Sequence, residues 1–103
     1  MNSATKKVYS IDELKSIVAP VAQQYGVAKV YLFGSFARGD YNESSDYDFC
    51  IERGKMRGLI ALSGFFQDLR NAVGREIDMV DIRALDMEFL NAVMSEGVVV
   101  YEG

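Results

Sequence analysis

Residues 29–52 read KVYLFGSFARGDYNESSDYDFCIE, and this stretch decides the fold. Residues 29–33 alternate and are rich in β-branched and aromatic side chains, which predicts a β-strand, and residues 46–52 predict a second strand in the same way. The segment between them has room only for a short helix over 35–39 and a turn over 40–45. Because so short a connection joins the two strands, we expect them to run antiparallel.

Two long helices are predicted on either side of this stretch. Ser10 and Glu13 have the spacing of a capping box, which predicts a helix that begins at Ser10. This helix is expected to end at Gly26 and to be kinked at Pro20. Its predicted apolar stripe consists of Ile11, Leu14, Val18, Val21 and Tyr25. A second helix, which ends at Gly74, has a predicted stripe of Leu59, Leu62, Phe66, Leu69 and Val73.

The remaining elements complete a mixed sheet. Residues 76–82 predict a third strand, and Asp86 is suited to cap a last helix, which is followed by a short strand or extended tail over 98–101. The long helix between the second and third strands favours a parallel crossover. The expected fold is therefore α/β (of the α+β kind), with a mixed three- to four-stranded sheet packed with helices, in a single domain over residues 1–103.

The composition narrows the classes of function. The chain has 103 residues, of which 50% are hydrophobic and 25% are charged, and this is ordinary for one globular domain. It contains no histidine, which excludes Ser-His-Asp and Cys-His catalysis and any histidine-ligated zinc site. The net charge of -4 and the pI near 4.7 disfavour direct binding of nucleic acid.

Nothing in the sequence predicts a membrane segment or an export signal. The longest apolar runs are too short to span a bilayer, and no apolar stretch follows Lys6 and Lys7. The one cysteine, Cys50, cannot form an internal disulfide and is expected to be a small buried apolar residue. We therefore expect a cytoplasmic protein; the sequence leaves its oligomeric state open, a homo-oligomer included.

Three aspartates are expected to meet on one face of the sheet. Side chains alternate along a strand, so Asp46 and Asp48 share one face, and Asp78 lies on the same side if the apolar faces of both strands pack on the helices. Carboxylates this close repel one another unless cations lie between them. Ligands that are all oxygen suit Mg²⁺ or Mn²⁺, and two such ions would clamp the attacking and leaving oxygens of a phosphoryl transfer. Asp81, by contrast, is expected to be an ordinary solvated strand residue.

The turn at Gly34 and Ser35 is the expected phosphate-binding half of the site. Glycine lets the backbone approach closely, the start of a helix directs N–H groups at an anion, and the Ser35 hydroxyl can donate one more hydrogen bond. Arg38, one helical turn later, can add a charge-assisted contact. The P-loop pattern is absent. Alone, a Gly-Ser turn or an Asp-x-Asp pair is weak evidence of a site, because most such residues form turns or caps. Their combination with a matching aspartate on a third strand indicates a phosphate- and metal-binding site.

Residues 32–40 and 45–49 resemble the signature of the DNA polymerase β-like nucleotidyltransferase superfamily. The pattern Gly-Ser, ten residues, Asp-x-Asp is intact, and the size and the ending over 96–102 make the chain similar to the minimal nucleotidyltransferases. The resemblance covers nearly the whole chain from about Ile11. It implies the nucleotidyltransferase fold and the transfer of a nucleoside monophosphate from a nucleoside triphosphate, with ATP as the expected substrate.

The resemblance also implies a role for each site residue. Gly34 and Ser35 would hold the triphosphate, and Asp78 would help to activate the acceptor hydroxyl. Many family members carry an arginine directly after the serine, whereas this chain has Phe36, so one phosphate contact is missing. The implied catalytic residues and metal ligands are Asp46, Asp48 and Asp78.

The acceptor is the part of the function that the sequence determines least. Minimal members of the family often serve as the antitoxin of a two-gene module and adenylylate an all-helical HEPN toxin on tyrosine, so a HEPN-type helical protein is the expected partner. One alternative is a binding module that silences such a partner by covering it, without turnover. Another is transfer to a small molecule such as an aminoglycoside, with a separate subunit that supplies the acceptor site.

Overall fold

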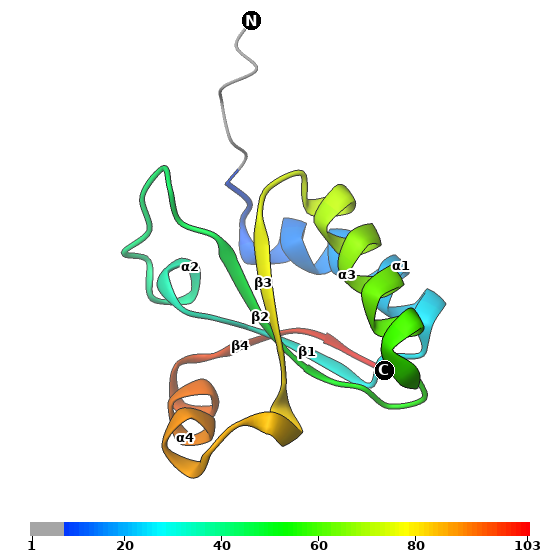
Figure 1. Ribbon diagram of the computed structural model, residues 1–103. Coiled ribbons are helices and arrows are strands. Elements are labelled where there is room, and N and C mark those ends of the chain that lie inside the picture. Colours follow the sequence, from blue (N-terminus) through cyan, green and yellow to red (C-terminus); the bar gives the residue numbers. More distant parts are fainter. Residues whose placement is uncertain (1–7) are drawn as a thin grey trace, which may run out of the picture.

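The computed structural model of the chain describes residues 8–103, which form one four-stranded sheet with helices on both faces. Figure 1 shows α1 and α3 together on one face and α4 on the other. The elements in chain order are α1 (Ile11–Tyr25), β1 (Lys29–Phe33), α2 (Ser35–Arg38), β2 (Tyr47–Glu52), α3 (Gly58–Val73), β3 (Ile77–Asp81), the 3-10 helix η1 (Ile82–Ala84), α4 (Met87–Glu96) and β4 (Val98–Glu102). In this described part of the chain, no helix is both long enough and apolar enough to cross a bilayer.

The sheet has the strand order β3-β2-β1-β4. β1 pairs antiparallel with β2 and with β4, and β2 pairs parallel with β3, so the predicted strand directions are confirmed. The last segment is a strand rather than a tail, and the sheet therefore has the larger of the two predicted strand numbers. β2 begins at Tyr47, one residue later than predicted, and this leaves Asp46 in the preceding loop.

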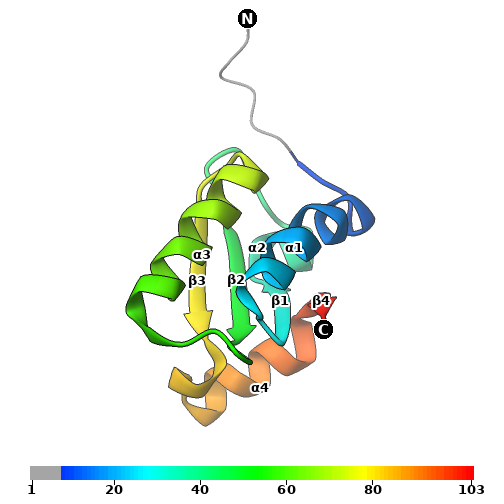
Figure 2. The same ribbon diagram turned by 90° about the vertical axis from the view of Figure 1, so that its right-hand side faces the viewer.

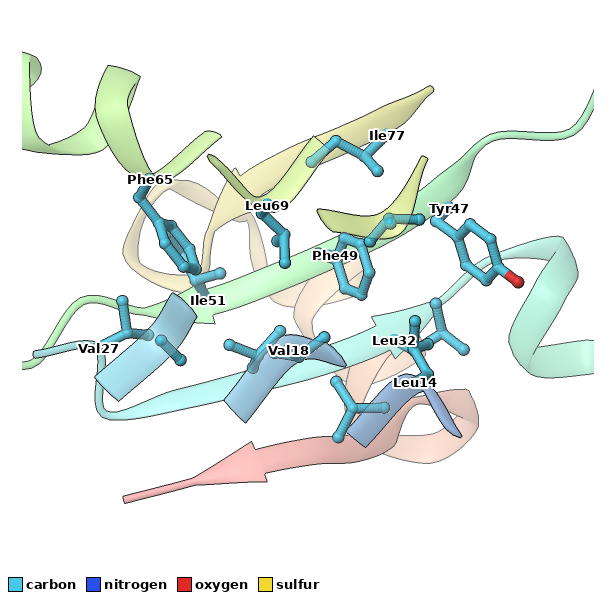
Figure 3. Close-up of a cluster of buried hydrophobic side chains, with 14 of the residues drawn as sticks. Leu14, Val18, Val27, Leu32, Tyr47, Phe49, Ile51, Phe65, Leu69 and Ile77 are labelled. Atoms are coloured by element: carbon cyan, nitrogen blue, oxygen red, sulfur yellow. The ribbon is translucent and has the colours of Figure 1, made fainter. Parts of the chain in front are cut away.

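The main core lies between the sheet and the pair α1 and α3, which cover it as Figure 2 shows. Alternate residues of β2 point into this core, and Tyr47, Phe49 and Ile51 are almost completely buried. Figure 3 shows them packed against side chains of both helices, among them Leu14 and Leu69. Each large apolar side chain that is fully buried stabilises the fold by about 1.5–3 kcal/mol, so this layer fixes the face of β2 that points away from the helices.

The ends of α1 are as predicted. The Ser10 hydroxyl accepts a hydrogen bond from the Glu13 N–H at 3.1 Å, and the Glu13 carboxylate accepts one from the Ser10 N–H at 2.8 Å. The helix ends at Gly26, which has a left-handed conformation. It continues through Pro20 to Tyr25 as one helix.

The predicted stripe of α3 is partly wrong. The buried residues of this helix are Phe65, Leu69 and Val73, which follow one another at steps of four. Leu59, by contrast, is 80% exposed. β3 is an edge strand of the sheet, so no further strand lies beyond it to bury the apolar side chains in the first turn of α3. The sequence pattern shows which side chains are apolar but not where the sheet beneath them ends.

The second face of the sheet is divided between two environments. Tyr31 and Cys50 are buried there beneath Val93 of α4, whereas Asp48, on the same face of β2 as Cys50, is only half-buried. The expectation that Cys50 is a buried apolar residue is confirmed. Burial, together with the nearby charges of Asp81 and Glu52, raises the pKa of the Cys50 thiol to about 11. α4 thus closes one half of this face and leaves the carboxylate half open.

Candidate active site

The turn between β1 and α2 brings Gly34 directly against a carboxylate. Gly34 has φ 74° and ψ -155°, a conformation that is open essentially to glycine alone. A Cβ atom at this position would overlap the Asp48 carboxylate oxygen Oδ2. Because Gly34 has no side chain, the backbone of the turn can pack directly against the Asp48 carboxylate.

Asp48 and Asp78 stand side by side on neighbouring strands. They are paired in the parallel register of β2 and β3, at a strand spacing of about 4.8 Å. Burial raises the pKa of Asp48, and the negative charges of Asp78 and Asp46 raise it further, while the positive charge of Arg38 partly offsets them. The Asp48 carboxylate therefore lies close enough to Asp78 and to Asp46 to be repelled by both.

The same three carboxylates do not form a finished metal site. Asp46 is exposed in the loop before β2. The Asp78 oxygen Oδ1 accepts a hydrogen bond from the Met79 N–H at 3.0 Å, which turns it toward its own backbone. Across residues 8–103, no three carboxylate or thiol side chains are already gathered around one point that could hold a cation. The side chains of Asp46 and Asp78 would have to rotate to share a cation with Asp48.

Arg38 lies at the expected place, one turn after Ser35, but it already has partners. Its Nε lies 3.2 Å from Oδ2 of Asp40, and its Nη1 lies 3.6 Å from Oε1 of Glu96 in α4. These ion pairs are solvent-exposed, so they are weak. A phosphate could compete for the guanidinium, provided that it displaced one of the two carboxylates.

Phe36, the residue directly after Ser35, belongs to an aromatic stack. Its ring centroid lies 4.0 Å from that of Tyr47 and 4.5 Å from that of Tyr41, with nearly parallel planes. The guanidinium of Arg75 lies over the same ring at 5.0 Å. Phe36 therefore helps to fix α2 on the sheet instead of contacting phosphate.

Arg75 is a supporting residue that the sequence reasoning missed. It is the one charged residue buried in the described chain. Its guanidinium donates to the carbonyl oxygens of Asn42, Glu43 and Ser45 at 2.9–3.2 Å. These bonds hold the turn that leads into Asp46. The signal in the sequence is only a lone arginine between Gly74 and β3, whose partners lie about thirty residues away.

Asp81 is not the ordinary solvated residue that was expected. Its carboxylate accepts hydrogen bonds from the backbone and the guanidinium of Arg83, and it lies 3.9 Å from Nη1 of Arg53. Burial alone would raise the pKa of Asp81, but the hydrogen bonds from Arg83 and the charge of Arg53 outweigh it and lower the pKa. Asp81 is a structural cap of η1, on the far end of β3 from Asp78.

Comparison with known proteins identifies the family of the chain. Residues 15–103 match the family model described as polymerase beta, nucleotidyltransferase. MJ0435 of Methanocaldococcus jannaschii is 29% identical over 89 residues, which cover 86% of this chain and 96% of that protein. The protein adenylyltransferase MntA of Thermococcus cleftensis is 25% identical over 95 residues, which cover 88% of this chain and 96% of MntA.

A solved structure has the same fold. It is the complex of a tri-AMPylated Shewanella oneidensis HEPN toxin with its MNT antitoxin, and it matches with a TM-score of 0.67 and 19% identity over 91% of this chain and 74% of that one. The open carboxylate face, the glycine turn against Asp48 and the family match over residues 15–103 lead to one conclusion. The chain belongs to the polymerase β nucleotidyltransferase family, and it is a nucleotidyltransferase.

Proposed function

We propose that this nucleotidyltransferase moves AMP from ATP onto a hydroxyl group of a protein, and that it acts as the antitoxin of a helical HEPN-type toxin. The similarity to MntA, a protein adenylyltransferase, and to an antitoxin bound to an AMPylated HEPN toxin supports this acceptor class. The observation that carries the proposal is the placement of Asp48 against Gly34 and in register with Asp78. This placement brings two carboxylates together with the Gly34 turn, to which we assign the phosphates.

The carboxylate cluster fits divalent cations in its chemistry. The donor set is all oxygen, which suits Mg²⁺ or Mn²⁺, and the repulsion that raises the pKa of Asp48 is what a cation would relieve. We assign Asp46 and Asp48 as ligands of both ions and Asp78 as the third ligand. Two bound cations would neutralise the carboxylates and stabilise the charge on the attacking and leaving oxygens.

The residues of the chain would then position the reactants. Ser35, the backbone of Gly34 and the guanidinium of Arg38 hold the β- and γ-phosphates, so that the α-phosphorus faces the carboxylates. The acceptor oxygen attacks the α-phosphorus, the bond to the bridging oxygen of the β-phosphate breaks, and pyrophosphate leaves with the bonding electron pair. Asp78 takes the proton of the acceptor hydroxyl. Catalysis in this class of reaction is mostly positioning and charge stabilisation.

The charge around the site favours a basic acceptor surface. Asp40, Asp46 and Asp78 are all exposed near the Gly34 turn. An acidic rim attracts a partner that presents lysine or arginine around its hydroxyl group, and it repels a second polyanion such as free nucleic acid. The proposal places the reaction in the cytoplasm, where ATP is available, and leaves a homo-oligomer open.

Transfer of label from ATP tests the proposal. The purified protein is incubated with Mg²⁺, α-labelled ATP and the HEPN-type protein encoded beside its gene. We expect label on a tyrosine of the partner with the wild-type protein and none with Asp48→Asn. Silencing of the partner by Asp48→Asn as efficiently as by the wild type, with no label in either case, would instead identify a non-catalytic binding module. Label on an aminoglycoside but not on the protein would identify a small-molecule acceptor.

A further inference from the structure

We propose that the cavity between α4 and the Gly34 turn is the nucleoside pocket, in which Phe89 contacts the base and Glu88 accepts hydrogen bonds from the amino group of adenine. The inference rests on the proposed function and adds to it the residues that select ATP among nucleoside triphosphates. It concerns α4, an element that neither the Gly-Ser turn nor the three aspartates include.

The cavity has the size and the walls of a small-ligand site. Its volume is about 380 Å³, which lies within the usual range for such pockets. The rings of Phe33 and Phe89, which both line it, meet edge to face with centroids 5.6 Å apart and an interplanar angle of 78°. The lining residues are Phe33, Gly34, Arg38, Asp86, Glu88, Phe89, Ala92, Val93 and Glu96.

The position of the cavity relative to the proposed phosphate site indicates that it binds the nucleoside and not the acceptor. The cavity shares Gly34 and Arg38 with the proposed triphosphate site, so it lies on the nucleotide's own side of the reacting phosphorus. An in-line displacement brings the acceptor from the side opposite to the leaving pyrophosphate. The nucleoside, which is covalently tied to the α-phosphate, must lie beside the triphosphate, and this cavity is directly beside it. Figure 1 shows α4 lying across from α2 at the same end of β1.

The polar groups of the cavity single out Glu88. The Asp86 carboxylate already caps α4 by accepting the Phe89 N–H at 2.8 Å, and Glu96 is paired with Arg38. Within residues 8–103, the Glu88 carboxylate has neither a hydrogen bond nor an ion pair. A carboxylate can only accept hydrogen bonds, and the 6-amino group of adenine can only donate them. Hypoxanthine, the base of inosine triphosphate (ITP), carries an oxo group at that position, and the Glu88 carboxylate would repel this oxygen.

Phe89 is expected to strengthen the binding of any base, and Glu88 is expected to make the binding selective for adenine. Phe89 is 43% exposed, so a flat base can cover its open side. Contact between a base and an aromatic side chain contributes about a tenfold gain in affinity or more, whichever base is bound. A site built to bond an amino group then disfavours the analogue that lacks it. ATP is therefore expected to bind more tightly than ITP, by about tenfold or more.

The test measures the affinity of three ligands, ATP, ITP and inorganic tripolyphosphate, by isothermal titration with Mg²⁺. Tripolyphosphate has no nucleoside and reports only on the phosphate site. We expect Phe89→Ala to weaken the affinity for ATP by about tenfold and to leave the affinity for tripolyphosphate unchanged. Ala92 lies at an exposed position on the cavity wall, and Ala92→Phe should fill the cavity. It should likewise weaken the affinity for ATP and leave the affinity for tripolyphosphate unchanged. Glu88→Gln should bring ATP and ITP to within about threefold of each other, because an amide both donates and accepts.

A control variant and the binding of tripolyphosphate distinguish failure of the nucleoside pocket from failure of the proposed function. Glu102→Gln removes an equivalent charge at the far end of the sheet, and it should preserve the preference for ATP over ITP. Equal binding of ATP and ITP by the wild type, or ATP affinity unchanged in both Phe89→Ala and Ala92→Phe, would overturn the nucleoside pocket and leave the nucleotidyltransferase site in place. Failure of the wild type to bind any of the three ligands would count against the proposed function itself. Thermal melts of each variant establish that it is folded.

Discussion

At the level of single residues, the site depends on the close approach of Gly34 to Asp48. Gly34 lies in the turn after β1 and Asp48 lies in β2, and a side chain at position 34 would overlap the Asp48 carboxylate. Gly39, five residues later, also has a positive φ, of 88°, but nothing lies within 4 Å of the position where its Cβ would be. The two glycines are therefore a matched pair: a side chain would be strained at either position, and at position 34 it would also overlap a carboxylate.

Gly34→Ala should destroy transfer activity and destabilise the fold by about 1–3 kcal/mol, because the alanine must adopt a glycine-only conformation and displace Asp48. Gly39→Ala should cost about 1 kcal/mol and keep its activity, since only the backbone preference opposes it. Label transfer and urea unfolding of the two variants check this. Equal loss of activity in both would mean that the contact with Asp48 is irrelevant to the site.

Asp48→Asn should raise the melting temperature of the metal-free protein. Burial and the charges of Asp78 and Asp46 raise the pKa of Asp48, so the fold disfavours its charged form at neutral pH, and a neutral amide removes that repulsion. The measurement is a thermal melt in EDTA at pH 7. Asp12→Asn, which neutralises an exposed carboxylate in the first turn of α1, is the control and should not raise the melting temperature. A strongly lowered melting temperature for Asp48→Asn would identify Asp48 as a structural residue.

At the scale of elements, the junction of β3 with η1 depends on Asp81. The Asp81 carboxylate caps η1 and lies between Arg53 and Arg83, which joins the loop after β2 to the segment after β3. The lowered pKa of Asp81 means that the ionised form is stabilised by folding. This contribution is present above the ordinary aspartate pKa of 3.8 and is lost as the pH falls below it.

Asp81→Asn should therefore lower the free energy of unfolding by up to about 1 kcal/mol at pH 7, because asparagine keeps the cap but loses the ion pairs with Arg53 and Arg83. The wild type and the variant should converge as the pH falls below the ordinary aspartate pKa. Urea unfolding of both proteins across the acidic range measures the difference. A difference that stayed constant down to the lowest pH would show that the carboxylate charge is not its source.

β2 carries the one cysteine on the face that α4 covers, and this protects the thiol. Cys50 is completely buried, and its pKa near 11 keeps it protonated at neutral pH. Because the folded-state pKa lies above the ordinary value of 9.0, the protonated thiol contributes stability below pH 9 that is lost as the pH rises through 11. Thiolate, the reactive form, is scarce in the native protein.

Alkylation of Cys50 by iodoacetamide at pH 7.5 should accordingly be slower than that of the unfolded chain by several orders of magnitude, because the thiol reacts only when α4 and β2 separate. The time course with and without denaturing urea, followed by mass spectrometry, provides the comparison. Rapid labelling of the native protein would mean that α4 does not remain on the sheet.

At the scale of the whole molecule, much of the architecture follows from local patterns. The alternation of residues 29–33 and 46–52 and the short link between them predict the antiparallel pair, and the helix of residues 58–73 predicts the parallel one. The alternation of side chains in β2 predicts that Asp48 lies on the face away from the helices. The resemblance of the Gly-Ser and Asp-x-Asp pattern to a known family predicts that the Gly34 turn and the carboxylates belong to one site. These features depend on neighbours within the motif, so the sequence alone determines them.

Other features depend on segments that are far apart in the sequence. Arg75 holds the turn before Asp46 across about thirty residues, and α4 covers Cys50 while it leaves Asp48 open. The exposure of Leu59 depends on where the sheet ends, and the pairing of Arg38 with Glu96 joins α2 to α4. Hydropathy and spacing cannot predict such contacts, because the same side chains would suit either environment until the elements are packed.

In the proposed site, Asp46, Asp48 and Asp78 accept a triphosphate only with divalent cations, on the turn at Gly34 and Ser35. Isothermal titration of the wild-type protein with ATP, once with Mg²⁺ and once with excess EDTA, tests this most directly. We expect saturable binding with Mg²⁺ and no measurable binding in EDTA, because three carboxylates repel a polyphosphate that no cation neutralises. Equal affinity for ATP in Mg²⁺ and in EDTA would contradict it.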